Sequence, residues 1–493
     1  MTKALFNRSL YISLLLAFAS PLPLSFCQSE KPNVLFIAID DLNTCPEGFN
    51  GESTVHTPNM TKLAEMGVRF TNAHCAAPAC NPSRASVMTG LAPATTGVYL
   101  NSNDWRANQV VQGRATLPQH FRDHGYRTLG GGKLYHAASL SNGMHEGYLD
   151  AKPWDEYYPS KNQQLPDEVE PPRIPMNGSA KQYRGYMDWA ALDIETDEMA
   201  DAKVVAWAEN HLARKHDKPL FLAVGIYRPH IPWWTPEKYF DRNPIESVEL
   251  PKVIKNDLAD VPEAGKAMRK QGWHDWMEEN GKWREAVQGY NASVSFTGDM
   301  VGRLLAALEA GPMADNTIVV LWTDHGYHLG QKRHWEKFAL WEQTTRVPLI
   351  VSAPGDFQRG LNCSEPVSLL DIFPTLNELC GIPLATRLDG ASLVPLLQNP
   401  NTKTGRAVVC TQDFNNHAIR SDKWRYIRYA DGSEELYDQI KDPENFHNLA
   451  DKQRHHSIKR ELATWLPAHN AEPHPTFNGQ KAMNDAYNAR QKK

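Results

Sequence analysis

The sequence predicts an α/β fold built on a largely parallel sheet, followed by a smaller antiparallel subdomain. Short, continuously apolar runs rich in β-branched residues alternate with longer segments of helical periodicity over most of the chain. Several of these runs end abruptly in charged residues, as strands do at the ligand-binding edge of an open parallel sheet. From about Ala407 the segments become short and closely spaced, which is typical of an antiparallel meander.

Four apolar runs are the predicted strands of the large sheet. Unbroken apolar sequence of this length indicates a strand that is buried on both faces, as in the interior of a parallel sheet. The run at 34–39 leads into Asp40 and Asp41, and the run at 317–322 leads into Asp324 and His325. The predicted strands are 34–39, 219–224, 317–322 and 347–351, and the predicted helices are 59–66, 116–124, 196–213 and 283–310.

Three regions divide the chain. Residues 31–397 are expected to form the large domain, in which the Pro-rich and acidic stretch 153–175 is predicted to be a long surface loop. Residues 398–493 are expected to form the C-terminal subdomain, with an antiparallel sheet and a terminal helix over 457–465. The third region, residues 1–27, is interpreted as a signal peptide.

The signal peptide is predicted from a short basic region and an apolar core. Lys3 and Arg8 flank the start of an apolar run at 10–19, which is too short to span a bilayer comfortably. Small residues near Cys27 suit a cleavage site; a lipoprotein anchor at Cys27 and a membrane anchor are the alternatives. We therefore expect a secreted or periplasmic protein with no stable membrane span.

Composition indicates a globular protein without affinity for nucleic acid. The formal net charge is -5 over 493 residues, and 41% of the residues are hydrophobic. A charge this small gives no bulk attraction to a polyanion, so an anionic substrate needs a local cationic pocket. The chain has seven cysteines, too few for a disulfide scaffold, and none has zinc spacing. Most are expected to be buried small apolar side chains.

Cys80 is the exception, because it stands at a predicted helix start. Pro82 suits a first turn, where no backbone donor is needed, and Gly90 closes the short helix. Cys80 then lies at the positive end of the helix, which favours anions, and Arg84 can point back toward it. The alternative is an ordinary buried cysteine before a helix that begins with proline.

The segment from Cys80 to Gly90 resembles the signature of the formylglycine-dependent type I sulfatases, Cys-x-Pro-Ser-Arg followed by Thr-Gly. Val87 and Met88 stand where many members have leucine. The resemblance implies an alkaline-phosphatase-like large domain and the oxidation of Cys80 to formylglycine, whose hydrated aldehyde attacks sulfur. It also implies a formylglycine-generating or anaerobic sulfatase-maturing enzyme as a partner.

Two pairs of residues after predicted strands indicate a metal site. Hard oxygen ligands at Asp40, Asp41 and Asp324 suit Ca²⁺ or Mg²⁺. The resemblance assigns these residues, His325 and Cys80 to one calcium ion, with Mg²⁺ as the alternative. Many sulfatases carry Asn where this chain has His325, a variant of the iduronate-2-sulfatase branch. Taken alone, Asp40-Asp41 is more simply a turn with solvated carboxylates; the second pair, Asp324-His325, favours the metal site.

Further catalytic roles come from the same resemblance. Lys133 and Lys337 are expected to grip sulfate oxygens, and Arg84 to stabilise the nucleophile. His136 is expected to contact the formylglycine hydroxyl and to assist sulfate release, and His230 is the candidate general acid. Alone, each lysine is more simply a solvated side chain and each histidine a structural one.

The likeness to iduronate-2-sulfatase extends over most of residues 31–397. It implies a sulfuric ester hydrolase that acts on a sulfated carbohydrate, with exo-acting removal of uronate 2-O-sulfate as the leading expectation. Arg228 is a candidate partner for the uronate carboxylate, or else only pairs with a surface acid. Alternatives are another sulfated glycan position, a phosphatase or phosphonate monoester hydrolase of the same superfamily, and a glycan-binding protein without activity. The matching stretches are 31–36, 189–193, 221–225, 228–232, 292–296, 324–326 and 369–376.

Overall fold

The computed structural model describes residues 31–49, 55–137, 149–161, 163–172, 187–270, 272–384 and 386–474. The expected signal peptide at 1–27 lies outside the described residues.

An eight-stranded sheet forms the centre of the large domain, in the order β13-β2-β12-β9-β1-β7-β4-β5. The neighbours β5, β4, β7, β1 and β9 all run parallel, whereas β12 is antiparallel to both of its neighbours. The parallel strands therefore end along one edge, where open sheets of this kind place their ligands. The strands are β1 (Asn33–Ile39), β2 (Val68–Phe70), β4 (Arg127–Gly132), β5 (Glu156–Tyr158), β7 (Leu220–Ile226), β9 (Thr317–Thr323), β12 (Leu349–Ser352) and β13 (Leu361–Cys363).

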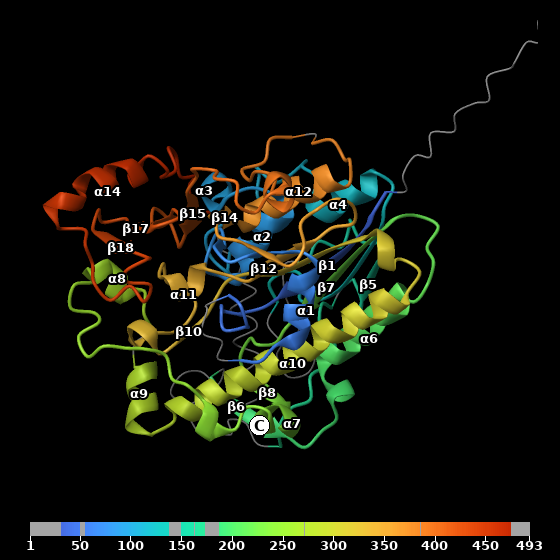
Figure 1. Cartoon of the computed structure of the whole chain (residues 1–493), viewed down its shortest axis with the longest axis horizontal. Coiled ribbons are helices and arrows are strands. Elements are labelled where there is room, and N and C mark those ends of the chain that lie inside the picture. Colours follow the sequence, from blue (N-terminus) through green and yellow to red (C-terminus); the bar gives the residue numbers. More distant parts are fainter. Residues whose placement is uncertain are drawn as a thin grey trace, which may run out of the picture. The chain divides into compact units, whose positions relative to one another are not determined.

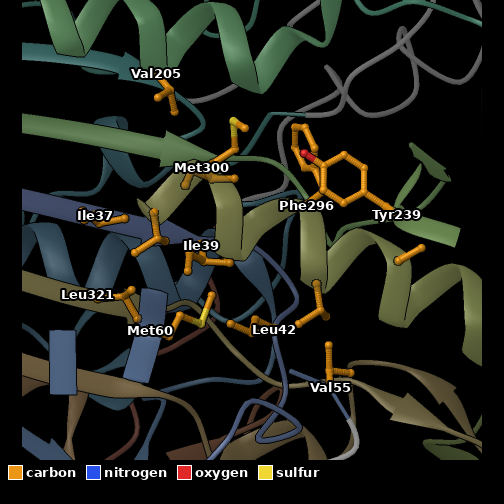
Figure 2. Packing of buried hydrophobic residues seen from close by; sticks show 14 of the residues in the cluster. Ile37, Ile39, Leu42, Val55, Met60, Val205, Tyr239, Phe296, Met300 and Leu321 are labelled. Atoms are coloured by element: carbon orange, nitrogen blue, oxygen red, sulfur yellow. The ribbon is translucent and has the colours of Figure 1, made fainter. Parts of the chain in front are cut away.

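Helices cover both faces of this sheet (Figure 1). Alternate residues of β1 point to opposite faces, so Phe36 joins one apolar core while Ile37 joins the other. Figure 2 shows the second core, where Ile37 and Leu321 of the sheet pack with Met60 and Met300 of two helices. One face carries α1 (Pro58–Met66), α6 (Ala200–Leu212) and α10 (Trp283–Ala310); the other carries α2 (Cys80–Thr89), α4 (Leu117–Asp123) and α12 (Ile372–Leu379).

A second sheet of four antiparallel strands follows, in sequence order. One of its faces contributes Ile427 and Tyr437 to the first core of the large domain, and the other packs Tyr426 and Leu436 against Leu462 of the last helix. This sheet is thus buried on both faces. Its elements are β15 (Val408–Thr411), β16 (His417–Arg420), β17 (Trp424–Arg428), β18 (Glu434–Asp438) and α14 (His456–Ala463).

Short elements connect these layers. The short strands are β3 (Ala73–His74), β6 (Trp189–Leu192), β8 (Trp233–Pro236), β10 (His328–Leu329), β11 (Trp335–Glu336) and β14 (Val367–Ser368). The short helices are α3 (Pro93–Thr96), α7 (Glu237–Asp241), α8 (Glu263–Ala267), α9 (Trp273–Glu279), α11 (Glu342–Thr345) and α13 (Val394–Gln398).

The predicted α/β fold with an antiparallel C-terminal sheet is confirmed. The prediction that the stretch 153–175 is entirely loop is wrong. Strand β5 lies within this stretch and forms one edge of the main sheet. Three residues are too few to show a strand periodicity. The division at 397/398 stays a prediction. In the part of the chain that the structure describes, we find no helix with the length and apolar character needed to cross a membrane.

A buried charge cluster joins the C-terminal sheet to the large domain. Arg425 of β17 lies with its Nη2 2.5 Å from Oε2 of Glu342, and Nε of Arg420 lies 3.4 Å from the same oxygen. Burial alone raises the pKa of Glu342, but Arg420 and Arg425 outweigh it and hold that pKa well below its usual range. The carboxylate therefore neutralises two arginines that have little contact with water.

Replacing Glu342 by Gln is expected to lower the free energy of unfolding by about 3–5 kcal/mol, because the buried guanidinium groups lose their counter-ion. The control is Lys62→Ala, which breaks an exposed pair with Glu309 and should cost less than about 1 kcal/mol. Denaturant unfolding and Tm measure both. Equal effects of the two substitutions would contradict the assigned role of the cluster.

Candidate active site

Four neighbouring strands carry the predicted site residues at their carboxyl ends. Ile39 of β1 pairs with Thr323 of β9, so Asp40 and Asp324 leave the sheet side by side. On the other side of β1, the last residue of β4 pairs with Gly225 of β7. Lys133 follows β4 directly, and the segment with His230 follows β7. The register of the sheet thus gathers residues that are far apart in sequence.

A glycine lets Lys133 approach β7. The backbone N–H of Lys133 donates to the carbonyl of Gly225 at 3.1 Å. A Cβ atom on Gly225 would lie 2.3 Å from the carbonyl carbon of Lys133, which no real contact permits. Any side chain at this position would therefore displace Lys133. Its Nζ lies 4.7 Å from the ring centre of Tyr227, an aromatic face that stabilises the cation.

Cys80 is the first residue of α2, a helix in which every residue is buried. Ala79 before it is extended, and Gly90 ends the helix in the left-handed conformation with φ 69°. The hydroxyl of Ser83 donates to the carbonyl of Asp324 at 2.5 Å, which fixes the first turn to the end of β9. The predicted helix start at Cys80 is therefore present, and its first turn faces the strand ends.

Cations surround the Cys80 thiol. Its Sγ lies 3.1 Å from Nζ of Lys337, 3.3 Å from Nε2 of His325 and 3.7 Å from Oδ1 of Asp40. Burial works to raise the pKa of the thiol, but Lys337, Lys133 and His325 outweigh it, and the pKa is lowered. The position therefore favours a negatively charged atom.

Asp40 is held as a carboxylate by two cations. Lys133 forms an ion pair with its Oδ2, and Nη2 of Arg84 lies 3.3 Å from its Oδ1. Although burial opposes ionisation, Lys133 and Arg84 keep the pKa of Asp40 well below its usual value. The same guanidinium donates from Nε to Asp324 at 2.8 Å and thereby ties the ends of β1 and β9 together.

Asp41 is in a different electrostatic environment. Its backbone is left-handed, with φ 58°, which turns the chain sharply after Asp40. Oδ1 accepts from Lys337 at 2.8 Å, whereas Oδ2 is buried and has no hydrogen-bond partner among the residues that the structure describes. Burial raises the pKa of this carboxyl to about 7. A buried carboxylate oxygen without a hydrogen-bond partner, such as Oδ2 of Asp41, is a suitable ligand for a cation.

The residues fit a metal ion. Ligand atoms of Asp40, Asp41, Cys80 and His325 all lie within 4.8 Å of one another, and all four residues are buried. Nδ1 of His325 donates to the carbonyl of Gly326 at 3.0 Å, so Nε2 is the nitrogen directed at the carboxylates. This second hydrogen bond orients the imidazole as a ligand. The buried carboxylates would hold a hard divalent cation, which would polarise the nucleophile and the bound anion.

Asp324 lies beside this group. Its Oδ1 accepts from the backbone N–H groups of Asp41 and His325, at 3.2 and 3.0 Å. Its Oδ2 lies 3.5 Å from Nε2 of His325, in addition to its contact with Arg84. Asp324 thus orients neighbouring groups in this structure, and its role as a metal ligand stays a prediction.

The two predicted catalytic histidines are both near the strand ends. Nε2 of His230 lies 3.8 Å from Oδ2 of Asp41, and its Nδ1 donates to the carbonyl of Ile231 at 2.6 Å. His136 is buried three residues after Lys133. Its assigned contact with the nucleophile stays a prediction.

Arg228 is engaged within the protein. The side chain is fully buried, its Nη2 lies 3.5 Å from Oε2 of Glu168, and its Nε donates to the carbonyl of Trp234 at 3.2 Å. This contact supports the interpretation that Arg228 pairs with an acid, although the Glu168 side chain is largely buried and not at the surface as expected.

Sequence reasoning missed the turn that presents Lys337. Lys332, Arg333, Glu336 and Phe338 have φ values of 55°, 50°, 76° and 72°, which are unfavourable for residues with a side chain. No glycine marks these positions, so the sequence gives no sign of the turn. Buried contacts must therefore stabilise its conformation.

Two buried side chains stabilise this turn. Nζ of Lys332 donates to Oδ1 of Asp257 at 2.5 Å and also to the carbonyl of Asn445. Nε2 of His334 donates to the carbonyl of Lys337 at 2.9 Å, and its Nδ1 accepts from the backbone of Lys270. Burial lowers the pKa of His334 to about 3, so the ring is neutral and can serve as both donor and acceptor.

Comparison with known proteins identifies the family. A sulfatase family profile matches residues 32–382, which is more than half of the chain. This chain belongs to the sulfatase family. A second profile, described as N-sulphoglucosamine sulphohydrolase, C-terminal, matches residues 330–472. The protein is thus a sulfuric ester hydrolase, and the prediction of an enzyme of this class is confirmed.

Individual relatives of this chain are also sulfatases. A sulfatase of Formosa agariphila is 37% identical over 460 residues, covering 90% of this chain and 87% of the relative. The iduronate 2-sulfatase of Mus musculus is 29% identical over 399 residues, covering 73% of this chain and 70% of the relative. Iduronate 2-sulfatase is therefore a distant relative of this sulfatase.

Solved structures confirm the fold. A putative sulfatase from Bacteroides thetaiotaomicron superposes with a TM-score of 0.67 at 23% identity, covering 94% of this chain and 93% of its own. A phosphonate monoester hydrolase of Agrobacterium radiobacter superposes with a TM-score of 0.70 at 23% identity, covering 88% and 95%. The alkaline-phosphatase-like fold is thus shared between sulfatases and phosphonate hydrolases, and by itself it does not distinguish their substrates.

Metal affinity of this site is expected to rise with pH. Without a metal, the pKa of Asp41 is about 7, and that of His325 is raised to about 9 by Asp324 and Cys80 against the effect of burial. Both groups carry a proton below these values, and a cation must displace it. Calcium should therefore bind roughly tenfold more weakly for each unit that the pH falls between about 9 and 7, where only His325 carries a proton, and roughly a hundredfold more weakly for each unit below about 7, where both groups do.

The measurement is the rise in Tm on adding calcium at about pH 5.5 and at about pH 8. Asp41→Asn should abolish most of the rise, whereas Asp299→Asn, at a partly exposed surface position, should leave it unchanged. The same rise at both pH values would contradict proton competition at these ligands.

Proposed function

We propose that this sulfatase removes sulfate from a sulfated sugar by exo-acting hydrolysis, with uronate 2-O-sulfate as the preferred group. The observation that carries the proposal is the charge arrangement around Cys80, where Lys337 and His325 contact the sulfur and Lys133 and Arg84 lie across Asp40. A sulfate group is a compact anion with three terminal oxygens, and such a ring of fixed cations can neutralise them as charge develops.

Relatives support a carbohydrate substrate. Besides the iduronate 2-sulfatases, an ulvan-active sulfatase of Formosa agariphila is 27% identical over 494 residues. A choline-sulfatase of Rhizobium meliloti is 30% identical over 444 residues, so small non-sugar sulfates also occur among the relatives. The kind of substrate, and the position on a sugar from which sulfate is removed, therefore have to be tested directly.

In the proposed mechanism, formylglycine made from Cys80 would supply the nucleophilic oxygen, and Asp40, Asp41 and His325 would hold a calcium ion that would supply Lewis-acid polarisation. Arg84 orients the nucleophile from the first turns of α2, while its other contacts hold Asp40 and Asp324 as ligands. Lys133 and Lys337 neutralise the sulfuryl oxygens. His136 assists the release of sulfate, which restores the site for the next substrate.

His230 is proposed to protonate the departing sugar oxygen. Burial and the nearby Lys133 and Lys337 hold the pKa of His230 well below its ordinary value, so the ring is neutral in the ligand-free protein. A bound sulfate ester adds negative charge that offsets these two cations and favours the imidazolium. The proton is thus gained as the substrate binds, when it is needed.

Export and maturation complete the proposal. Residues 1–27 direct the chain to a secreted or periplasmic location, where sulfated polysaccharide or oligosaccharide is broken down. A formylglycine-generating or anaerobic sulfatase-maturing enzyme converts Cys80 beforehand.

Sulfate release from a panel of defined sulfated sugars tests the substrate. The chain is co-produced with a formylglycine-generating enzyme, and peptide mass confirms conversion at position 80. We expect release from a uronate 2-sulfate and not from its positional isomers. Cys80→Ser should lose roughly 10³-fold or more in kcat/KM, because it lacks the thiol from which formylglycine is made.

Other outcomes of this panel are informative. If sulfate is released from a different sugar position, the protein is still a sulfatase, but the assignment of uronate 2-O-sulfate as its substrate is wrong. A phosphate or phosphonate ester with a higher kcat/KM would favour that branch of the superfamily, and glycan binding without turnover would favour an inactive glycan receptor.

The role of His230 predicts a dependence on the leaving group. For His230→Gln we expect kcat to fall by roughly 10²-fold or more on a sugar sulfate, whose alkoxide is a poor leaving group. On 4-nitrocatechol sulfate, which needs little protonation, the fall should be less than about tenfold. Lys337→Ala is the control and should slow both substrates. Equal losses for His230→Gln on the two substrates would rule out the general-acid role.

A further inference from the structure

Two buried cysteines outside the catalytic site lie in contact with each other. Sγ of Cys75 is 3.8 Å from Sγ of Cys410, although the residues are 335 positions apart in sequence. Cys75 has no exposed surface, and Cys410 is 3% exposed. The two sulfur atoms thus face each other in the interior, where solvent does not separate them.

The backbone already holds both cysteines in place. Cys75 follows β3, and its N–H donates to the carbonyl of Thr345 at 2.9 Å. Cys410 belongs to β15, and the next residue, Thr411, donates to the carbonyl of Ala76 at 2.9 Å. Bond formation between the sulfurs therefore requires rotation of two side chains, with the adjoining backbones already hydrogen-bonded to one another.

A metal site does not account for this pair. Within the described ranges, the cluster of Asp40, Asp41, Cys80 and His325 is the group of His, Cys, Asp and Glu side chains close enough to hold an ion. Cys75 and Cys410 are outside it. Two thiolates without further ligands do not make a structural zinc site, which takes four.

We propose that Cys75 and Cys410 form a disulfide that covalently joins the segment before the nucleophile helix to the C-terminal sheet. The two thiols lose two protons and two electrons and form one S–S bond. The oxidant is a disulfide of the protein or glutathione type, which is reduced to two thiols. The exported location proposed above provides such an oxidant.

The position of the pair gives the bond two consequences. It closes a very long loop, which restricts the unfolded chain strongly and stabilises the folded state. It also anchors the stretch Cys75–Ala79, which leads directly into Cys80, to β15. Because both thiols are buried in the folded protein, the bond has to form before folding is complete.

Peptide mapping tests the bond directly. The full chain carrying Cys80→Ser is folded with reduced and oxidised glutathione, alkylated in denaturant without reductant and digested with trypsin. Cleavage after Arg69, Arg84, Arg406 and Arg420 gives peptides 70–84 and 407–420, each with one cysteine in this variant. We expect the two peptides to be linked, and to separate on reduction.

Stability gives a second measurement. The protein folded with glutathione should have a Tm higher by a few °C, roughly, than the same protein folded with dithiothreitol. Cys410→Ser should remove this difference, whereas Cys363→Ser, at another buried cysteine, should keep it. Recovery of peptides 70–84 and 407–420 in alkylated, unlinked form after folding with glutathione, or linkage of either cysteine to a different partner, would overturn the proposal.

Discussion

The ion pairs that join Asp40 to Lys133 and Arg84 are the contacts on which the candidate site depends. They connect the ends of β1 and β4 with the nucleophile helix, and Arg84 extends the connection to β9 through Asp324. All of these groups are buried, so each charge is tolerated only because the others neutralise it. Asp41 has a contact with Lys337 at one oxygen, but its other oxygen has no hydrogen-bond partner among the described residues, and burial raises its pKa. Asp41 is therefore the carboxyl group that gains most from binding a cation.

The sequence predicted the fold well where its signals are long. The helix 283–310 was predicted with the bounds that the structure has, and residues 317–322 differ from β9 by one residue. Strand order was beyond sequence reasoning, because β1 lies between β7 and β9 through tertiary contacts that leave no local pattern. The edge strand β5 was missed for a related reason, since its three residues are defined by pairing with β4.

The candidate site was predictable to a similar degree. Carboxylates directly after buried strands indicated a ligand site, and the structure brings Asp40, Asp41 and His325 together with Cys80. The turn that places Lys337 beside Cys80 could not be predicted from the sequence. Its non-glycine residues have left-handed backbones, and these are stabilised by partners distant in sequence, such as Asp257. Arg228 shows the opposite limit: it is close in sequence to His230, but its contacts with Glu168 and the carbonyl of Trp234 could not be read from that closeness.

The anchor of Lys332 on Asn445 changes how the C-terminal part should be regarded. These residues are 113 positions apart, yet the contact stabilises the turn that brings Lys337 to the nucleophile. The segment that follows β18 in this chain consequently helps to shape the reaction centre. Ending the chain before Asn445 would remove an anchor of the turn that carries Lys337, although Asn445 itself lies outside the reaction centre.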